Sequence, residues 1–86
     1  MYGVVWLGPA LDRLPDIYVR LDLANQDQLA VAVDALNARL RADPFAEGES
    51  RSGRYRITFV DRIAVRFWVD EPAGVVRVTA VGLFRR

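Results

Sequence analysis

The 86-residue chain contains no cysteine, no histidine and no lysine. It therefore has no thiol nucleophile, no imidazole base, and no thiolate or imidazole ligand for zinc. An oxygen-only metal site would need a cluster of carboxylates, and the sequence shows none, so we expect neither a metal nor a cofactor. All 12 basic residues are arginines, whose planar and permanently charged guanidinium groups suit phosphate.

Long hydrophobic runs are absent as well. No apolar segment approaches the roughly 20 residues that span a bilayer, and the N-terminus has no basic segment followed by an apolar one. We therefore expect no membrane partner and a cytoplasmic location. The length suits one domain with a modest two-layer core, so residues 1–86 are interpreted as a single domain.

The net charge of +1 conceals an uneven distribution. Residues 1–47 hold four arginines against seven acidic residues, which gives this half a net charge of −3. Residues 48–86 hold eight arginines against four acidic residues, which gives a net charge of +4. The C-terminal half therefore favours an anionic partner.

The N-terminal half predicts one strand and a first helix. Residues 2–7 form a short run rich in aromatic and β-branched residues, which is typical of a strand. Gly8-Pro9 opens the helix, because proline suits the first helical position. Pro15 removes one backbone hydrogen bond and predicts a kink or a restart. The apolar stripe expected to be buried is Leu11, Leu14, Tyr18 and Leu21.

A second helix follows, with a clearer pattern. Asn25 is predicted to cap its N-terminus, and Gln28 completes a capping box. The helix is expected to end at Asp43-Pro44, because the residue before proline is pushed out of the helical region. Its predicted buried face is Leu29, Ala32, Val33, Leu36 and Leu40.

Three strands are predicted in the last third of the chain, over residues 54–59, 62–69 and 75–81. Successive side chains on a strand point to opposite faces. The expected core face collects Tyr55, Ile57, Phe59, Ile63, Val65, Phe67, Val69, Val76, Val78 and Ala80. The expected opposite face collects Arg54, Arg56, Thr58, Arg62, Arg66, Trp68, Arg77 and Thr79.

The predicted order of elements is thus β-α-α-β-β-β. The last three strands form an antiparallel meander, the first strand joins that sheet, and a helix hairpin packs on its apolar face. This arrangement is an α+β fold of two layers.

The arginine-bearing face allows two interpretations. It is either a phosphate-binding surface, with Trp68 stacking on a base, or a solvated sheet face with Trp68 covered by an arginine stem or a partner. Exposed apolar area at Trp6, Trp68, Val75 and Val81 indicates an interaction partner.

The whole chain resembles toxins of the RelE/ParE superfamily, from bacterial type II toxin–antitoxin systems. The resemblance rests on the order strand, helix hairpin and three-stranded meander, and on short motifs at matching positions. The motifs are Leu40-Arg41-Ala42-Asp43-Pro44, Gly48-Glu49-Ser50-Arg51, Gly53-Arg54-Tyr55-Arg56, Val69-Asp70-Glu71 and residues 76–82.

The resemblance implies a growth-inhibiting toxin that a cognate antitoxin neutralises. RelE-like members cleave mRNA on the ribosome with basic residues and often a C-terminal tyrosine, whereas ParE-like members inhibit DNA gyrase. Arg54 and Arg56 match two of the RelE-type basic residues and are the candidate catalytic residues of an endoribonuclease. A further arginine of that type falls on Ile63, beside Arg62, and the terminal tyrosine is missing.

These departures favour gyrase inhibition over cleavage of ribosome-bound mRNA. A degenerate, non-toxic protein-binding module is the competing interpretation. The residues predicted to bind the target or nucleic acid are Arg54, Arg56, Arg62, Arg66, Trp68, Arg77, Arg85 and Arg86.

Overall fold

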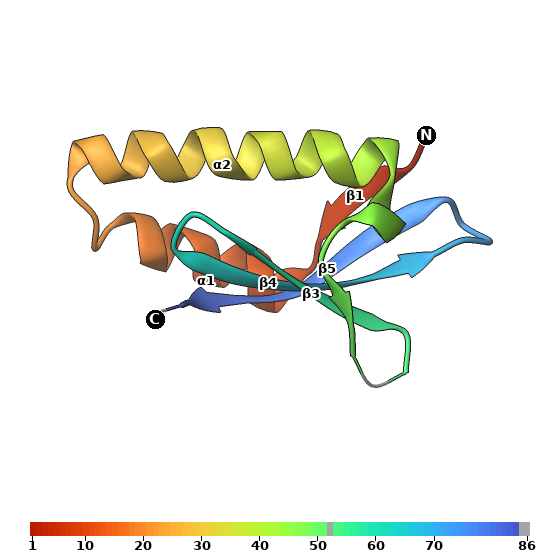
Figure 1. Cartoon of the computed structure of the whole chain (residues 1–86). Helices are drawn as coiled ribbons and strands as arrows, with labels where there is room; N and C mark the ends of the chain where they lie inside the picture. Colours follow the sequence, from red (N-terminus) through yellow and green to blue (C-terminus); the bar gives the residue numbers. More distant parts are fainter. Residues whose placement is uncertain (52, 85–86) are drawn as a thin grey trace.

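The computed structural model describes residues 1–51 and 53–84, and it confirms the predicted α+β architecture (Figure 1). The elements are β1 (Gly3–Trp6), α1 (Gly8–Tyr18), α2 (Leu23–Ala42), the 3-10 helix η1 (Pro44–Ala46), β2 (Glu49–Ser50), β3 (Tyr55–Val60), β4 (Ile63–Asp70) and β5 (Val75–Leu83). The 3-10 helix η1 and the short strand β2 are additions to the predicted order. In the part of the chain that the structure describes, no helix is long and apolar enough to cross a membrane.

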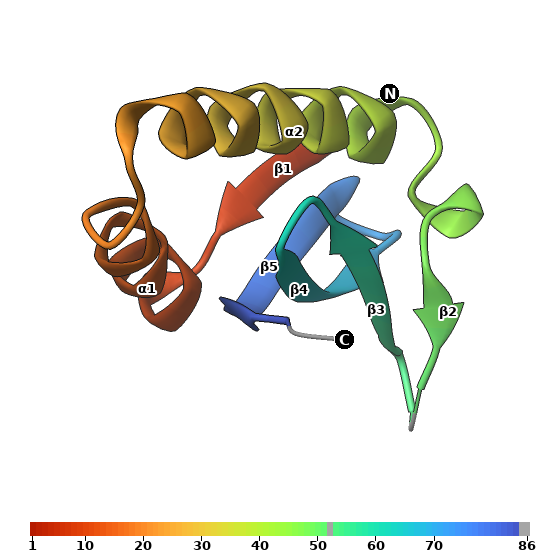
Figure 2. The same cartoon turned by 60° about the vertical axis from the view of Figure 1, so that its left-hand side comes forward.

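The strands form one five-stranded sheet in the order β1-β5-β4-β3-β2. The neighbours from β5 to β2 run antiparallel, and β1 runs parallel to β5. β1 pairs with residues 75–78, and α1 packs against β5. Figure 2 shows α2 crossing one face of the sheet and α1 lying beside β5.

The first helix differs from its prediction in its buried face, and its course at Pro15 excludes one of the two predicted outcomes. α1 continues through Pro15, whose ring is exposed, so the proline does not restart the helix. Its buried residues are Ala10 and Ile17, whereas Leu11 is 58% exposed. The direct passage from β1 fixes the rotation of the helix, because the Leu7 N–H still donates to the Val78 carbonyl at 2.9 Å. Leu14, Tyr18 and Leu21 pack at the margin of the core, as half-buried residues.

The second helix begins earlier than predicted. Its N-cap is Asp22, whose carboxylate accepts a hydrogen bond from the Asn25 N–H at 2.9 Å. Aspartate and asparagine are equally good caps, so two candidates three residues apart compete in the sequence. The predicted end at Ala42 and the burial of Leu29, Val33, Leu36 and Leu40 are confirmed, while Ala32 is half-buried.

The turn between β3 and β4 decides which side chains of β3 face the helices. Val60 lies opposite Ile63 across a two-residue turn, in which Asp61 has a φ of 50°. Directly paired residues share a face, so Val60 joins the buried Ile63 and the alternation runs back along β3 from there. The prediction for β3 is therefore wrong by one residue. Arg56, Thr58 and Val60 point toward the helices, and Tyr55, Ile57 and Phe59 point away from them.

A β-bulge changes the alternation in β5. Phe67 pairs with Val78, whereas Arg66 pairs with Ala80, so Thr79 is an extra residue in β5. The Thr79 hydroxyl donates to the carbonyl oxygen of Arg66 at 3.2 Å. Beyond the bulge the faces exchange. Ala80, predicted in the core, shares a face with Arg66. Val81, predicted to be exposed, is buried instead.

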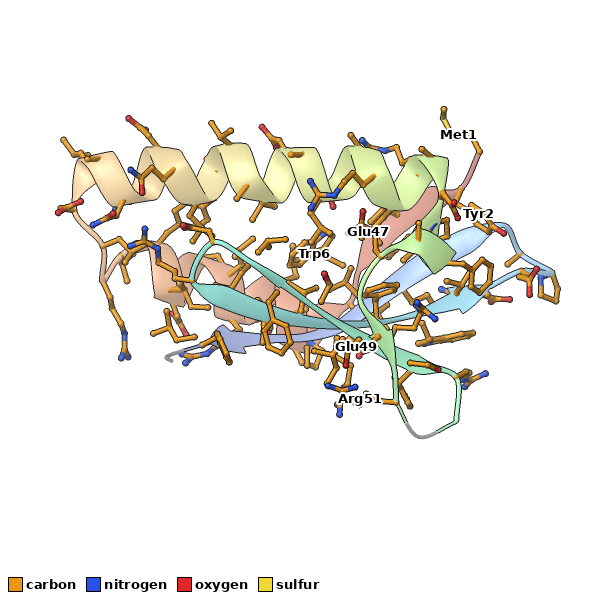
Figure 3. The ribbon with its side chains drawn as sticks, in the orientation of Figure 1. Met1, Tyr2, Trp6, Glu47, Glu49 and Arg51 are labelled. Atoms are coloured by element: carbon orange, nitrogen blue, oxygen red, sulfur yellow. The ribbon has the colours of Figure 1, made fainter. Side chains whose placement is uncertain are left out.

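The core lies between the helices and the sheet. Its members are Ala10, Ile17, Leu29, Val33, Leu36, Leu40, Val60, Ile63, Val65, Phe67, Val76, Val78 and Val81. Trp6 also lies on this side, between α2 and the sheet (Figure 3), where its indole Nε1–H donates to Asn37 Oδ1 at 3.0 Å. Trp6 is therefore half-buried and does not contribute to an exposed apolar surface.

Candidate functional site

The sheet face that points away from α2, here called the outer face, carries the candidate site. By register, its residues on β3, β4 and β5 are Tyr55, Ile57, Phe59, Ala64, Arg66, Trp68, Val75, Arg77, Ala80 and Gly82. Figures 1 and 2 show α2 on the opposite side of the sheet and α1 at its β5 margin. The outer face is therefore accessible to a partner.

Arginines and aromatic rings interleave at one end of this face. The guanidinium carbon of Arg54 lies 3.8 Å from the centroid of the Trp68 ring, and that of Arg77 lies 5.6 Å from it. The guanidinium carbon of Arg66 lies 5.2 Å from the centroid of the Tyr55 ring. These are cation–π distances. We call these five residues the arginine–aromatic cluster.

The cluster carries positive charge that the described residues do not neutralise. The ion pairs on this side of the sheet are Arg77 with Asp70 at 3.1 Å and Arg51 with Glu49 at 3.0 Å. Figure 3 shows the second pair below the sheet, away from α2. Within residues 1–51 and 53–84, Arg54 and Arg66 form no ion pair. Their N–H groups can thus bind a carboxylate or a phosphate of a partner.

Arg56 does not belong to the outer face, contrary to the prediction. Its side chain lies on the helix side and donates to three backbone carbonyls. The acceptors are Glu47 O at 3.1 Å, Phe45 O at 3.0 Å and Gly48 O at 3.3 Å. These carbonyls belong to the segment from η1 to β2. Arg56 therefore holds that segment against β3.

Arg62 is also directed elsewhere. Its Nε donates to Asp61 at 2.8 Å, and its Nη2 donates to Asn25 Oδ1 at 3.0 Å and to Gln28 Oε1 at 3.2 Å. The hydrogen bond with Asp61 raises the pKa of the Arg62 guanidinium. Arg62 thus ties the β3–β4 turn to the first turns of α2, so the prediction that it shares a face with Arg66 is wrong.

The structure brings together half of the residues predicted to bind the target. Arg54, Arg66, Trp68 and Arg77 meet in the arginine–aromatic cluster. Arg56 and Arg62 make structural contacts, and Arg85 and Arg86 lie outside the described residues. The pattern of β3 missed Tyr55, which was expected in the core.

A shallow hollow of about 350 Å³ adjoins the cluster on the outer face. Its lining residues are Ile57, Ala64, Arg66, Ala80, Val81 and Gly82. The hollow exists because three outer-face positions on β4 and β5 hold small residues: Ala64 pairs with Gly82, and Ala80 pairs with Arg66. Two small residues two positions apart on one strand, Ala80 and Gly82, could have indicated this hollow, but it was not predicted from the sequence.

Two phenylalanines flank this hollow. Phe59 pairs with Ala64 at its edge and is 50% exposed. Its ring centroid lies 4.6 Å from that of Phe84, which is 38% exposed. The outer face thus joins a cationic end to an apolar end.

The geometry supports binding more than bond cleavage. Asp70 and Glu49, two carboxylates on this side of the sheet, are held in ion pairs. Burial and the charge of Asp34 raise the pKa of Tyr18, so this phenol stays protonated at neutral pH and supplies no base. In residues 1–51 and 53–84, no group of carboxylates could hold a metal ion. Arginine stabilises a developing negative charge but does not remove a proton.

Comparison of the chain with protein-family models, with curated proteins and with solved structures found no match.

Proposed function

We propose that the chain is the toxin of a type II toxin–antitoxin system, that it binds its target stoichiometrically through the outer face, and that DNA gyrase is the favoured target. The observation that carries the proposal is a pair of arginines on the outer face, Arg54 and Arg66, which form no ion pair and lie under no helix among the residues that the structure describes. The order of elements agrees with the RelE/ParE resemblance. The exposed Phe59 and Phe84 give a cognate antitoxin an apolar surface to cover.

Cleavage of ribosome-bound mRNA is the alternative, and the contacts of one residue weigh against it. Arg56, which matches a RelE-type basic residue, uses its guanidinium on three backbone carbonyls. These bonds occupy its Nε and Nη2 and hold the side chain on the helix side, so a phosphate on the outer face could engage Arg56 only after these contacts break. The position expected to hold another arginine is Ile63, which is completely buried.

The purified chain is expected to inhibit supercoiling by gyrase when the two proteins are present in comparable molar amounts, because a binding toxin does not turn over. Replacing both Arg54 and Arg66 by alanine should raise the concentration needed for inhibition by about tenfold or more. Arg20→Ala is the matched control, because Arg20 is an exposed arginine in the turn after α1 and its substitution should leave inhibition unchanged.

The same samples should be added to a translation system with ribosome-bound mRNA. Cleavage by substoichiometric amounts of the chain would contradict the proposal and favour a RelE-like endoribonuclease. Absence of both inhibition and cleavage would favour the non-toxic binding module.

A further inference from the structure

We infer that the hollow beside Arg66 is an anchoring site for one bulky apolar side chain of a partner protein, carried on a segment whose neighbouring residues are acidic. This inference deepens the proposed function, because only the proposed function says which protein the partner is. The recognition chemistry, however, follows from the outer face alone.

The apolar part of the recognition comes from the shape and lining of the hollow. Five of its six lining residues are Ile57, Ala64, Ala80, Val81 and Gly82, which offer no polar side-chain atom. A Cβ atom built on Gly82 meets no atom within 4 Å, so there is open space above the strand at this point. The half-exposed Phe59 extends the apolar surface at the edge. Interfaces gain most of their affinity from a large side chain that fills such a pocket.

The acidic part comes from the arginines around it. Arg66 lines the hollow itself, and within the described ranges it forms no ion pair. Arg54 lies next to it in the arginine–aromatic cluster and, in the part of the chain that the structure describes, also forms no ion pair. A guanidinium stacked on a ring keeps its N–H groups for two parallel hydrogen bonds to a carboxylate. An acidic residue next to the apolar anchor would meet one of them.

Nucleic acid fits this surface less well. The Trp68 ring already has Arg54 and Arg77 beside it, and the Tyr55 ring has Arg66. A base could stack on either ring only after displacing a guanidinium. Arg66 is the one side-chain donor among the lining residues of the hollow, so the hollow offers few groups that could read the edge of a base.

A random linear peptide library displayed on phage provides a probe that assumes no partner. Selection on the immobilised full chain is expected to enrich peptides that combine one large aliphatic or aromatic residue with neighbouring aspartates or glutamates. Fluorescence anisotropy of a labelled selected peptide then gives its Kd. Gly82→Leu should weaken binding by at least about tenfold, because the new side chain fills the hollow in the partner's place. Arg66→Glu should weaken it by a similar factor.

The matched control is Gly8→Leu, because a Cβ at Gly8 also meets no atom within 4 Å but lies at the start of α1. Circular dichroism should show that both glycine variants are folded. The inference is overturned if no acidic and apolar consensus emerges, or if Gly82→Leu binds the selected peptide as well as Gly8→Leu does. It is also overturned if a single-stranded RNA oligonucleotide binds more tightly than the peptide and depends on Arg66.

This outcome is independent of toxicity. A chain that binds the peptide through the hollow but neither inhibits gyrase nor arrests growth would contradict the proposed function and leave this inference intact. The reverse pattern would contradict only the inference.

Discussion

Replacing Phe67 by alanine is expected to lower the free energy of unfolding by about 3–5 kcal/mol. Phe67 lies in the middle of β4, is completely buried, and is among the largest side chains of the core. Removing its ring deletes the apolar contacts and leaves a cavity between β4 and the helices. Small domains are stable by only about 5–15 kcal/mol, so the variant should be near the limit of folding. Urea unfolding followed by circular dichroism gives the change directly.

Phe59→Ala is the control that separates the two faces of the sheet. Phe59 is 50% exposed and lies on the outer face, so its loss should cost about 1 kcal/mol or less. The two substitutions are chemically identical and lie on neighbouring strands. Equal losses would show that β3 has the opposite orientation, with Phe59 in the core.

Gly48→Ala is expected to destabilise the protein by about 2–6 kcal/mol, the sum of backbone strain and a steric clash. Gly48 has a φ of +66°, which L side chains rarely adopt. A Cβ added here would lie 2.2 Å from the carbonyl oxygen of Ile57 and 2.7 Å from its carbonyl carbon. Both are backbone atoms of β3 and cannot rotate away. The segment held by Arg56 would have to move, and the hydrogen bond from Arg56 to the Gly48 carbonyl would be lost.

Gly53→Ala isolates the contribution of the clash. Gly53 has a similar φ of +64°, but a Cβ there meets no atom within 4 Å. Its substitution should therefore cost only the strain of the left-handed conformation, about 1–2 kcal/mol. Unfolding curves for the two variants should differ by the clash alone. Equal stability of the two would contradict the close packing of the η1–β2 segment on β3.

The sequence predicted the elements well because their patterns are local. The buried face of α2 repeats at helical spacing, and the proline after Asp43 marks its end. The three long strands follow from runs of β-branched and aromatic residues bounded by turn residues. None of these signals depends on contacts with distant parts of the chain.

The orientation of β3 could not be predicted in this way. Hydrophobicity alone places Tyr55, Ile57 and Phe59 in the core, whereas register across the Asp61 turn places them outside. The inward position of Arg56 is tolerable only because carbonyls of the segment from η1 to β2 accept its hydrogen bonds. That arrangement is a tertiary contact with no local signature.

The error is informative about function. A strand that turns its aromatic residues toward solvent and its polar residues toward the core breaks the usual rule, and such departures concentrate at functional surfaces. The bulge at Thr79 acts in the same direction, since it moves Ala80 to the outer face and so opens the hollow. Local strand patterns contain neither feature, yet both shape the candidate site.

Growth of a bacterial host after induction of the chain, measured as viable counts without any antitoxin, tests the central claim most directly. We expect growth arrest by the native chain and by Arg20→Glu. Arg66→Glu should restore viable counts by about tenfold or more, because it reverses the charge of an outer-face arginine that has no ion pair within the described ranges. Immunoblots of the soluble fraction should show equal amounts of all three proteins. Normal growth with the native chain, or arrest by Arg66→Glu equal to that of Arg20→Glu, would contradict the role of the outer face in a toxin.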